Sequence, residues 1–212
     1  MADRIRFYFD PRCPWSFQTA RWVRRLEQVG VVEVAWSVFS LDIVNQRDGA
    51  AAPPDSGGAP ALRTALVVRQ SHGERAVGAF YEALGTAVHI DRRTVDDPSV
   101  IEDALRSAGS DPGTLRRAMA DAATWEAVKA EHDSAVNDKG AFGVPTIALD
   151  GGDGPAIFGP IVCDLPDDES ARELWSHVRW LIANDSFAEL KRGRPRRPDF
   201  AKHGGGDTAR AA

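Results

Sequence analysis

Cys13 is the residue in this sequence whose position favours covalent chemistry. It lies in the segment Asp10-Pro11-Arg12-Cys13-Pro14-Trp15-Ser16, which follows a short apolar run and precedes a helical pattern. The N-terminus of a helix offers unpaired N–H donors and a partial positive charge, and both stabilise a thiolate. We therefore expect the pKa of Cys13 to be lowered and its thiolate to act as a nucleophile. The alternative is a small buried side chain without chemistry, which describes most free cysteines.

The other chemically capable residues form no recognisable site. Cys163 is too far along the chain from Cys13 for a two-cysteine metal knuckle. The sequence also lacks a phosphate loop, a dinucleotide fingerprint and a serine-nucleophile elbow. None of the histidines has a metal-site spacing to cysteines or carboxylates; they are His72, His89, His132, His177 and His203. The sequence thus predicts no metal, and any reduction would draw its electrons from thiols.

The composition is that of an ordinary globular protein. Of the 212 residues, 43% are hydrophobic and 27% charged, and the formal net charge is -5, which argues against disorder and against a nucleic-acid partner. The basic run Lys191–Arg197 is therefore interpreted as a solvated tail. The charged N-terminus lacks the apolar run of a signal peptide, and no stretch approaches the ~18 apolar residues of a membrane span. We expect a cytoplasmic monomer or homodimer in a reducing compartment, with no membrane partner.

The elements around Cys13 follow from local patterns. Ile5 to Phe9 is apolar, β-branched and aromatic, which predicts a buried strand that ends at Asp10. Pro14 suits the first position of a helix, and apolar residues recur after it at helical spacing until Gly30. A second strand is expected over Val31 to Phe39. A strand–helix–strand unit of this kind predicts a parallel pair with a right-handed crossover.

The remaining chain divides by composition. Residues 47–60 hold prolines and glycines and predict a loop or lid, residues 61–139 carry helical patterns, and residues 193–212 predict a flexible tail. Residues 145–149 and 156–158 predict a hairpin, and residues 169–184 predict a final helix. The predicted fold class is therefore α/β, with one sheet covered by helices on both faces. Its sheet domain is discontinuous, over residues 1–46 and 140–192, with an all-helical insertion between them.

Several separated segments carry a resemblance to a known family. The run from Phe7 to Trp15 resembles the active-site segment of DsbA-like thioredoxin-fold proteins, and in particular of the actinobacterial mycothiol-dependent nitroreductase group. Further segments resemble the same group in the same order. They are Ser40 to Asn45, Gln70 to Gly73, Tyr81 to Gly85, Gly143 to Ile147, Phe158 to Pro160 and Phe187 to Arg192.

The resemblance implies a thioredoxin-like fold, an active cysteine at Cys13 and a low-molecular-weight thiol, mycothiol, as co-substrate. It also implies a cis peptide bond between Val144 and Pro145, in a loop that lies against the active cysteine. The backbone of Val144 and Thr146 beside this proline would face a small organic or disulfide substrate. Further substrate contacts would come from Pro14, Trp15 and Asn45.

Ser16 departs from the pattern of the dithiol relatives, which carry C-P-W-C. A serine forms no S–S bond, so it cannot release a mixed disulfide from Cys13. The remaining route is monothiol chemistry, in which the Cys13 thiolate attacks a disulfide or an activated electrophile and an external thiol releases it. Ser16 would then serve as a hydrogen-bond donor to the thiolate.

Three alternatives stay open at this stage. Cys163 follows the second hairpin strand and would be a resolving partner if its Cα atom lay about 4.4–6.8 Å from that of Cys13. Kappa-class glutathione transferases and hydroxychromene-carboxylate isomerases are similar in architecture, and in a protein of that type Ser16 and the helix N-terminus would activate a bound thiol instead of Cys13. The third alternative is a binding protein in which the replacement of the second cysteine by Ser16 has abolished turnover.

Overall fold

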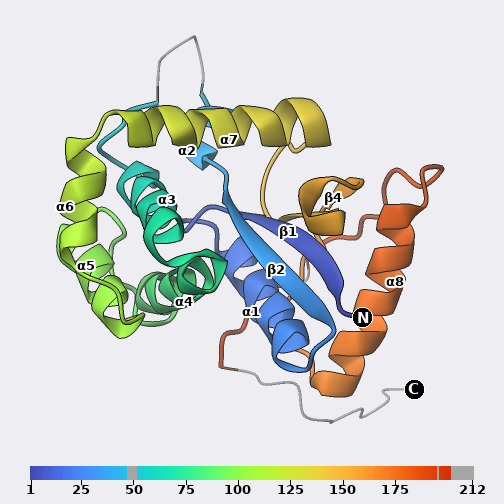
Figure 1. The fold of residues 1–212 in the computed structure, drawn as a ribbon. Coiled ribbons are helices and arrows are strands. Elements are labelled where there is room, and N and C mark those ends of the chain that lie inside the picture. The colour runs from blue at the N-terminus through green and yellow to red at the C-terminus, as the bar shows by residue number, and fades with distance from the viewer. Residues whose placement is uncertain (47–51, 195, 202–212) are drawn as a thin grey trace.

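The protein is built on a four-stranded mixed sheet. The computed structural model describes residues 1–46, 52–194 and 196–201, and the sheet has the order β2-β1-β3-β4 (Figure 1). Its strands are β1 (Asp3–Phe9), β2 (Val32–Val38), β3 (Thr146–Leu149) and β4 (Ala156–Phe158). β1 is parallel to β2, whereas β3 is antiparallel to both β1 and β4. The predicted parallel pair and the predicted hairpin are confirmed.

Helices follow each of the first two strands, form the insertion between the two halves of the sheet and end the fold after β4. The first is α1 (Pro14–Gln28), and a four-residue helix α2 (Leu41–Val44), which the sequence did not predict, follows β2. The insertion comprises α3 (Ala59–His72), α4 (Glu74–Gly85), a π-helical turn η1 (Thr86–Ile90), α5 (Pro98–Ser107), α6 (Gly113–Ala120) and α7 (Ala123–Lys139). A 3₁₀ turn η2 (Asp150–Gly152) joins β3 to β4, and α8 (Asp168–Ala183) comes last. The α/β class with an all-helical insertion is confirmed.

The loop expected over residues 47–60 is shorter than predicted. Ala59 and Pro60 already form the first turn of α3, because proline fits a helical N-terminus where its missing N–H has no partner. Gly58 donates its backbone N–H to Asp42 at 3.0 Å, and the carbonyl of Pro54 accepts from Arg63 at 2.7 Å. Residues 47–51 of the predicted lid lie outside the described residues.

One face of the sheet carries the main core. Ile5, Phe7 and Phe9 alternate along β1 and are almost fully buried, together with the alternate residues of β2. In Figure 1, α1 lies behind these strands, α8 lies to their right and the helical insertion forms a lobe to their left. The insertion is joined to this core by Tyr81 of α4, whose ring stacks on Phe9 with a centroid distance of 4.0 Å and meets Trp36 edge-on at 5.9 Å. Such aromatic contacts orient the insertion in addition to burying area.

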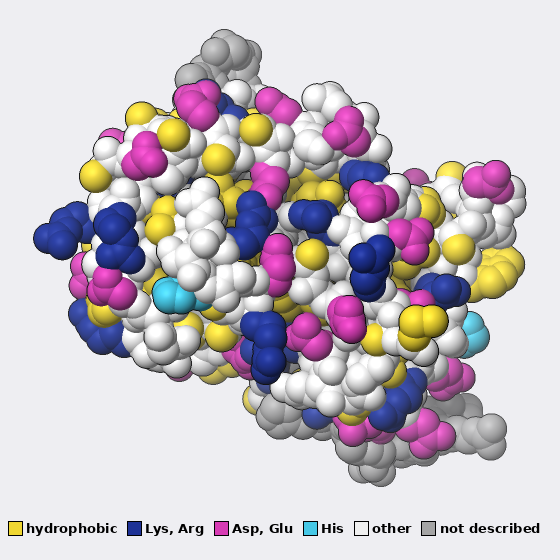
Figure 2. All heavy atoms as spheres, in the orientation of Figure 1, with side chains coloured by type: hydrophobic (Ala, Val, Ile, Leu, Met, Phe, Trp, Pro, Cys, Tyr) yellow, Lys and Arg dark blue, Asp and Glu magenta, His cyan; other side chains and the backbone are white. Residues whose placement is uncertain are grey.

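Helices lie on both faces of the sheet as predicted, but the opposite face is covered only at one end. α7 packs over Tyr8 and Phe39 near the carboxyl ends of β1 and β2, where Ala135 is buried. Toward the amino ends of the same two strands, Arg4 and Glu33 are exposed and Arg6 is only partly buried. Charged residues alternate there with the buried ones because this half of the face meets water. Figure 2 shows acidic and basic side chains interspersed across the visible surface.

The free edge of β2 is blocked by side chains from the insertion. Glu74 accepts from the backbone N–H of Trp36 at 2.8 Å, and Glu131 accepts from that of Val38 at 3.0 Å. Arg69 donates to the carbonyl of Trp36 at 3.1 Å and forms an ion pair with Glu131. Satisfied edge groups cannot pair with another strand, so these contacts protect the sheet from edge-to-edge association.

The segment after residue 193 differs from the predicted flexible tail over the part that the structure describes. Asp199 donates its N–H to the carbonyl of Cys163 at 2.9 Å, and its own carbonyl accepts from Gln18 at 3.3 Å. The ring of Phe200 packs at 5.6 Å from that of Phe17 on α1, and Arg196 pairs with Asp164. We call residues 196–201 the C-terminal strap. Within the described parts of the chain, no helix combines the length and the apolarity needed to cross a membrane.

The contact between α4 and α1 gives a test of this packing. A Cβ atom at Gly85 would lie 2.1 Å from the ring of the buried Phe17. We expect Gly85→Ala to lower the free energy of unfolding by about 2 kcal/mol or more, although alanine has the higher helix propensity. At Gly113 the added atom would meet only the Asp111 side chain, so Gly113→Ala should stay within about 0.5 kcal/mol of the wild type. Urea unfolding measures both, and equal stabilities would contradict the close approach.

Candidate functional site

Cys13 is the N-cap residue of α1. Its backbone N–H donates to the carbonyl of Asp10 at 3.0 Å, which closes the turn between β1 and α1. Its sulfur accepts from the backbone N–H of Ser16 at 3.4 Å and lies 3.6 Å from the carbonyl oxygen of Val144, to which the thiol donates. Pro14 takes the first helical position, as predicted. The half-buried sulfur is thus held between the helix end and the loop before β3.

The loop before β3 presents the backbone of Val144 to the sulfur, and not the hydroxyl of Thr146. The peptide bonds Val144–Pro145 and Gly159–Pro160 are both cis. The hydroxyl of Thr146 donates to the carbonyl of Gly143 at 2.8 Å, and the carbonyl of Pro145 accepts from the N–H of Gly159 at 2.8 Å. Thr146 is fully buried, so its side chain holds the loop and does not face the substrate side.

Ser16 is completely buried and is linked to the insertion. Its hydroxyl oxygen accepts from the phenol of Tyr81 at 3.2 Å. Burial raises the pKa of Tyr81 well above its ordinary value, and the neighbouring Cys13 and Asp10 act in the same direction, so the phenol stays protonated as a donor. Ser16 stands where the dithiol relatives have a second cysteine. Its side chain is held by Tyr81 and is buried, so no substrate can reach it.

Two of the predicted substrate contacts differ in their surroundings. Trp15 is half-buried, and the guanidinium of Arg194 lies over its ring at 5.1 Å from the centroid. Asn45 is exposed, and its side chain donates to the carbonyl of Leu41 at 2.8 Å, where it ends α2. Among the described contacts, none joins Asn45 to the Cys13 loop. The structure therefore brings Cys13, Pro14, Trp15, Ser16, Val144 and Pro145 together, and places Asn45 at the C-cap of α2.

Asp10 is a functional candidate that sequence analysis missed. It is fully buried directly before the Cys13 loop, where it accepts from the backbone N–H of Arg12 at 2.8 Å and from that of Leu41 at 2.7 Å. Burial raises its pKa to about 6, although these two donors and the charge of Arg12 act in the opposite direction. Arg12 also forms an ion pair with Asp42. A strand that ends on an aspartate just before a cysteine at a helix N-terminus was the available signal.

The electrostatic balance at Cys13 corrects the prediction of a lowered pKa. Burial raises the pKa of the thiol above its ordinary value, and the nearby Asp10 adds to this. The backbone N–H groups of Ser16 and Trp15 and the charge of Arg194 lower it, but burial dominates. The helix N-terminus that the sequence revealed is present, but the sequence did not reveal how far the sulfur is removed from water.

Cys163 contacts the C-terminal strap. Both cysteines are free thiols. The carbonyl of Cys163 accepts from Gln18 at 3.1 Å, and its sulfur lies 4.0 Å from the carbonyl of Arg196. Its described contacts are thus with the strap and with Gln18, which lies on α1 about one and a half turns after Cys13.

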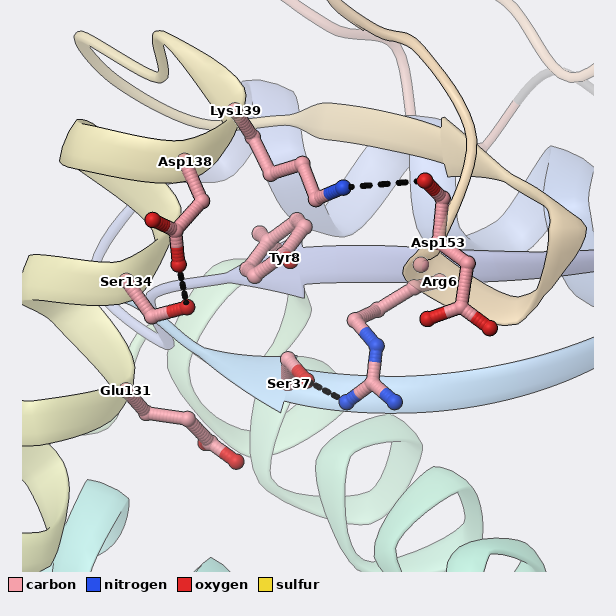
Figure 3. A pocket seen from close by; sticks show the side chains of 9 residues that line it. Arg6, Tyr8, Ser37, Glu131, Ser134, Asp138, Lys139 and Asp153 are labelled. Atoms are coloured by element: carbon pink, nitrogen blue, oxygen red, sulfur yellow. Dashed lines mark hydrogen bonds between the residues drawn. The ribbon is translucent and has the colours of Figure 1, made fainter.

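A polar pocket of about 310 Å³ lies on the open half of the sheet (Figure 3). Arg6 and Tyr8 of β1 point into it, with acidic residues of α7 on one side and the η2 turn on the other. Arg6 donates to Ser37 at 2.8 Å and to the carbonyl of Gly151 at 3.0 Å. None of the predicted site residues lines this pocket. The described residues contain no cluster of three or more His, Cys, Asp or Glu side chains arranged to hold a metal ion.

The family of the chain follows from comparison with known proteins. The family model described as "Rv2466c-like: Mycothiol-dependent nitroreductase Rv2466c" matches residues 12–192, which include the Cys13 motif and the loop before β3. The chain belongs to this family. It is an oxidoreductase of the DsbA-like class, and the resemblance noted in the sequence is confirmed. "Uncharacterized protein Rv2286c" of Mycobacterium tuberculosis is 31% identical over 197 residues, covering 92% of this chain and 83% of that protein.

Solved structures show the same fold at low sequence identity. The cytosolic disulfide reductase DsbM from Pseudomonas aeruginosa, solved with GSH, superposes with a TM-score of 0.58 at 17% identity, covering 83% of this chain and 99% of DsbM. A 2-hydroxychromene-2-carboxylate isomerase superposes with a TM-score of 0.59 at 17% identity, covering 84% of this chain and 95% of that one. Both likenesses concern the thioredoxin-like fold, which the two chemistries share.

The buried Asp10 predicts an unusual dependence of stability on pH. Its folded-state pKa of about 6 lies above the ordinary value of about 3.9, so the folded state binds the proton more tightly than the unfolded state. Stability should therefore fall as pH rises from about 4 to about 6, by about 3 kcal/mol for this group. We expect ¹³C NMR to show the Asp10 carboxyl titrating near pH 6, assigned by its loss in Asp10→Asn.

Asp167 is the internal control for this titration. It caps α8 through the N–H of Ser170, a hydrogen bond that lowers its pKa below the ordinary range. The two carboxyls should therefore shift in opposite directions within one spectrum. A midpoint for Asp10 at or below about 4 would contradict its buried, raised-pKa state.

Proposed function

We propose that the protein is a monothiol reductase in which Cys13 forms a mixed disulfide that a low-molecular-weight thiol resolves. The observation that carries the proposal is the position of the sulfur. It lies at the N-cap of α1, 3.6 Å from the backbone of Val144, while Ser16 behind it is buried and bonded to Tyr81. One thiol faces the reaction partner, and the residue at the resolving position is unable to form a disulfide.

The proposed cycle exchanges disulfides without a further oxidant. The Cys13 thiolate attacks one sulfur of a disulfide R′SSR′, the S–S bond breaks, and one R′S⁻ leaves while Cys13–S–S–R′ forms. A small thiolate RS⁻ then attacks the R′ sulfur, which restores the Cys13 thiolate and releases RSSR′. The net reaction oxidises RS⁻ and reduces one half of the original disulfide. Ser16 contributes its backbone N–H, which stabilises the thiolate at both stages.

The raised pKa of Cys13 favours the reductive direction. A thiol of low pKa is a good leaving group, so its disulfides act as oxidants. Burial of Cys13 and the charge of Asp10 work the other way and make its thiolate more basic. A more basic thiolate is the better nucleophile once it forms, and it is displaced less readily from a mixed disulfide. Attack of the external thiol on the sulfur of the bound substrate, with Cys13 as the leaving group, is therefore expected to be the slow step of the cycle.

Family membership supports mycothiol as the thiol co-substrate and a small organic or disulfide compound as the substrate. The disulfide reductase DsbM, which shares the fold, was solved with GSH, which supports a small thiol as the co-substrate here. We place the reaction in the cytoplasm, because a monothiol cycle needs a pool of reduced thiol. The residues proposed to contact the substrate are Trp15, Pro14 and the backbone of Val144 and Pro145.

A thiol transferase or isomerase is the second candidate, and the fold of the 2-hydroxychromene-2-carboxylate isomerase favours it. In that case the helix N-terminus, including the backbone N–H of Ser16, would stabilise the thiolate of the bound small molecule, and Cys13 would be dispensable. A raised pKa at Cys13 is compatible with a spectator thiol as well. The two candidates therefore differ in whether Cys13 becomes covalently modified during turnover.

Intact-protein mass spectrometry distinguishes these functions. We expect the wild type and Cys163→Ser to gain one adduct from an oxidised small thiol, and a second thiol to remove it. Cys13→Ser should gain none and should lose disulfide reduction by about 10²-fold or more. Alkylation of Cys13 should accelerate as pH rises, with a midpoint above the ordinary pKa of a free cysteine, because burial raises its pKa.

Other outcomes overturn the proposal in distinct ways. Full turnover by Cys13→Ser, with no adduct on the wild type, would establish the transferase. An adduct on Cys13 that no thiol removes would indicate a binding protein that does not cycle. An adduct that Cys163→Ser traps but the wild type releases would make Cys163 the resolving cysteine.

A further inference from the structure

The C-terminal segment places a cation beside the reactive cysteine. The guanidinium of Arg194 lies over the indole of Trp15, two residues after Cys13, at 5.1 Å from the ring centroid. This is the geometry of a cation–π contact, which fixes a charge in place without neutralising it. Among the described residues no carboxylate pairs with Arg194, whereas the neighbouring Arg196 pairs with Asp164. The charge of Arg194 thus remains available to a ligand.

The strap that follows Arg194 is anchored along its length. Its main chain is bonded to Cys163 and Gln18 through Asp199, and Arg21 of α1 donates to the carbonyl of Phe200 at 3.1 Å. The ring of Phe200 lies against two rings, those of Phe17 at 5.6 Å and His89 at 6.0 Å. These contacts hold the strap against α1, the helix that begins at Cys13.

His89 connects the same cluster to the Cys13 loop. Its Nε2 lies 2.9 Å from the carbonyl of Pro11, to which it donates, and its ring packs at 5.3 Å from that of Phe17. Burial lowers the pKa of His89, so the ring is neutral and adds no competing charge at neutral pH. The strap, the π-helical turn and the Cys13 loop therefore meet around Phe17.

Two opposite charges act on the sulfur from different elements. The buried Asp10 raises the pKa of Cys13, and Arg194 lowers it. Arg194 is exposed, while Asp10 is inaccessible to any substrate. A reaction partner that approaches from solvent therefore meets the positive charge first. Attraction of an anion by such a charge increases its local concentration at the site.

We propose that Arg194 and Trp15 form a subsite for the anionic group of the molecule that reacts at Cys13, and that residues 196–201 are the strap that holds this subsite. The inference rests on the proposed function, since it concerns the partner of the same thiol. The group bound is a thiolate or a carboxylate close to the reacting sulfur. A resolving thiol attacks as RS⁻, so every turnover of the proposed cycle brings such an anion to this position.

Paired alkylating reagents test the subsite. In a Cys163→Ser background, Cys13 is alkylated with iodoacetate, which is anionic, and with iodoacetamide, which is neutral. The ratio of the two rates at one pH cancels the thiolate fraction and reports the preference for an anion. We expect Arg194→Gln to lower this ratio by about three- to tenfold at low salt, as expected for the loss of one solvent-exposed unit charge whose interaction is weakened by water. Salt at about 0.5 M should remove most of the difference.

Matched variants separate the subsite from general charge effects. Arg197→Gln removes the same charge from an exposed residue of the same segment, and its ratio should stay within about 1.5-fold of the parent. Arg194→Lys should retain most of the preference. Phe200→Ala removes the anchor against Phe17 and should lower the ratio in the same direction as Arg194→Gln, with circular dichroism confirming that the protein is folded.

The outcomes are separable from those of the proposed function. Any accessible thiol reacts with both reagents, so the ratio is readable even if no mixed disulfide forms or turns over. An unchanged ratio in Arg194→Gln would overturn the subsite while leaving the adduct on Cys13 unaffected. An equal loss in Arg197→Gln would also overturn it, because the preference would then come from the charge of the whole segment.

Discussion

The buried carboxylate of Asp10 is the constraint on which the site depends. It ends β1 and accepts from the backbone of Arg12 and of Leu41, so the loops after the two parallel strands are bonded to one side chain. The loop after β1 carries Cys13, and the loop after β2 begins α2. A buried carboxyl without partners would be costly, and these two N–H donors make its burial possible. The position of the sulfur at the helix N-cap is a consequence of this turn.

Much of the fold was predictable because its signals are local. The run before Asp10, the proline at the start of α1 and the helical spacing of the insertion each depend on neighbouring residues. The open half of the sheet was missed, although Arg4, Arg6 and Glu33 alternate with buried residues along their strands. The apolar character of the two strands outweighed this alternation in the prediction. Which half of a face α7 covers depends on helix packing across the insertion, which periodicity does not specify.

The site was predicted in its chemistry but not in its electrostatics. Cys13, Pro14 and Val144 meet as expected, because the motif and the resemblance both concern the same loops. Burial raises the pKa of the sulfur, and the two charges that also shift it come from other parts of the chain: Asp10 from the end of β1 and Arg194 from the C-terminal segment. Thr146 was assigned to the substrate side, yet its hydroxyl closes its own loop. Such long-range placements have no signature in sequence spacing.

The opposing charges around Cys13 have a consequence for how a single thiol can complete a cycle. Asp10 and burial make the thiolate basic, which strengthens its bond to a substrate sulfur and slows its departure. A second cysteine would overcome this by its high effective concentration, but Ser16 offers no such route. The rate of release must then depend on how well an external thiolate is gathered at the site. In the proposed cycle, a cation held over Trp15 performs this task in the part of the site that solvent reaches, and it offsets the slow departure of Cys13 that burial and the carboxylate impose on the resolving step.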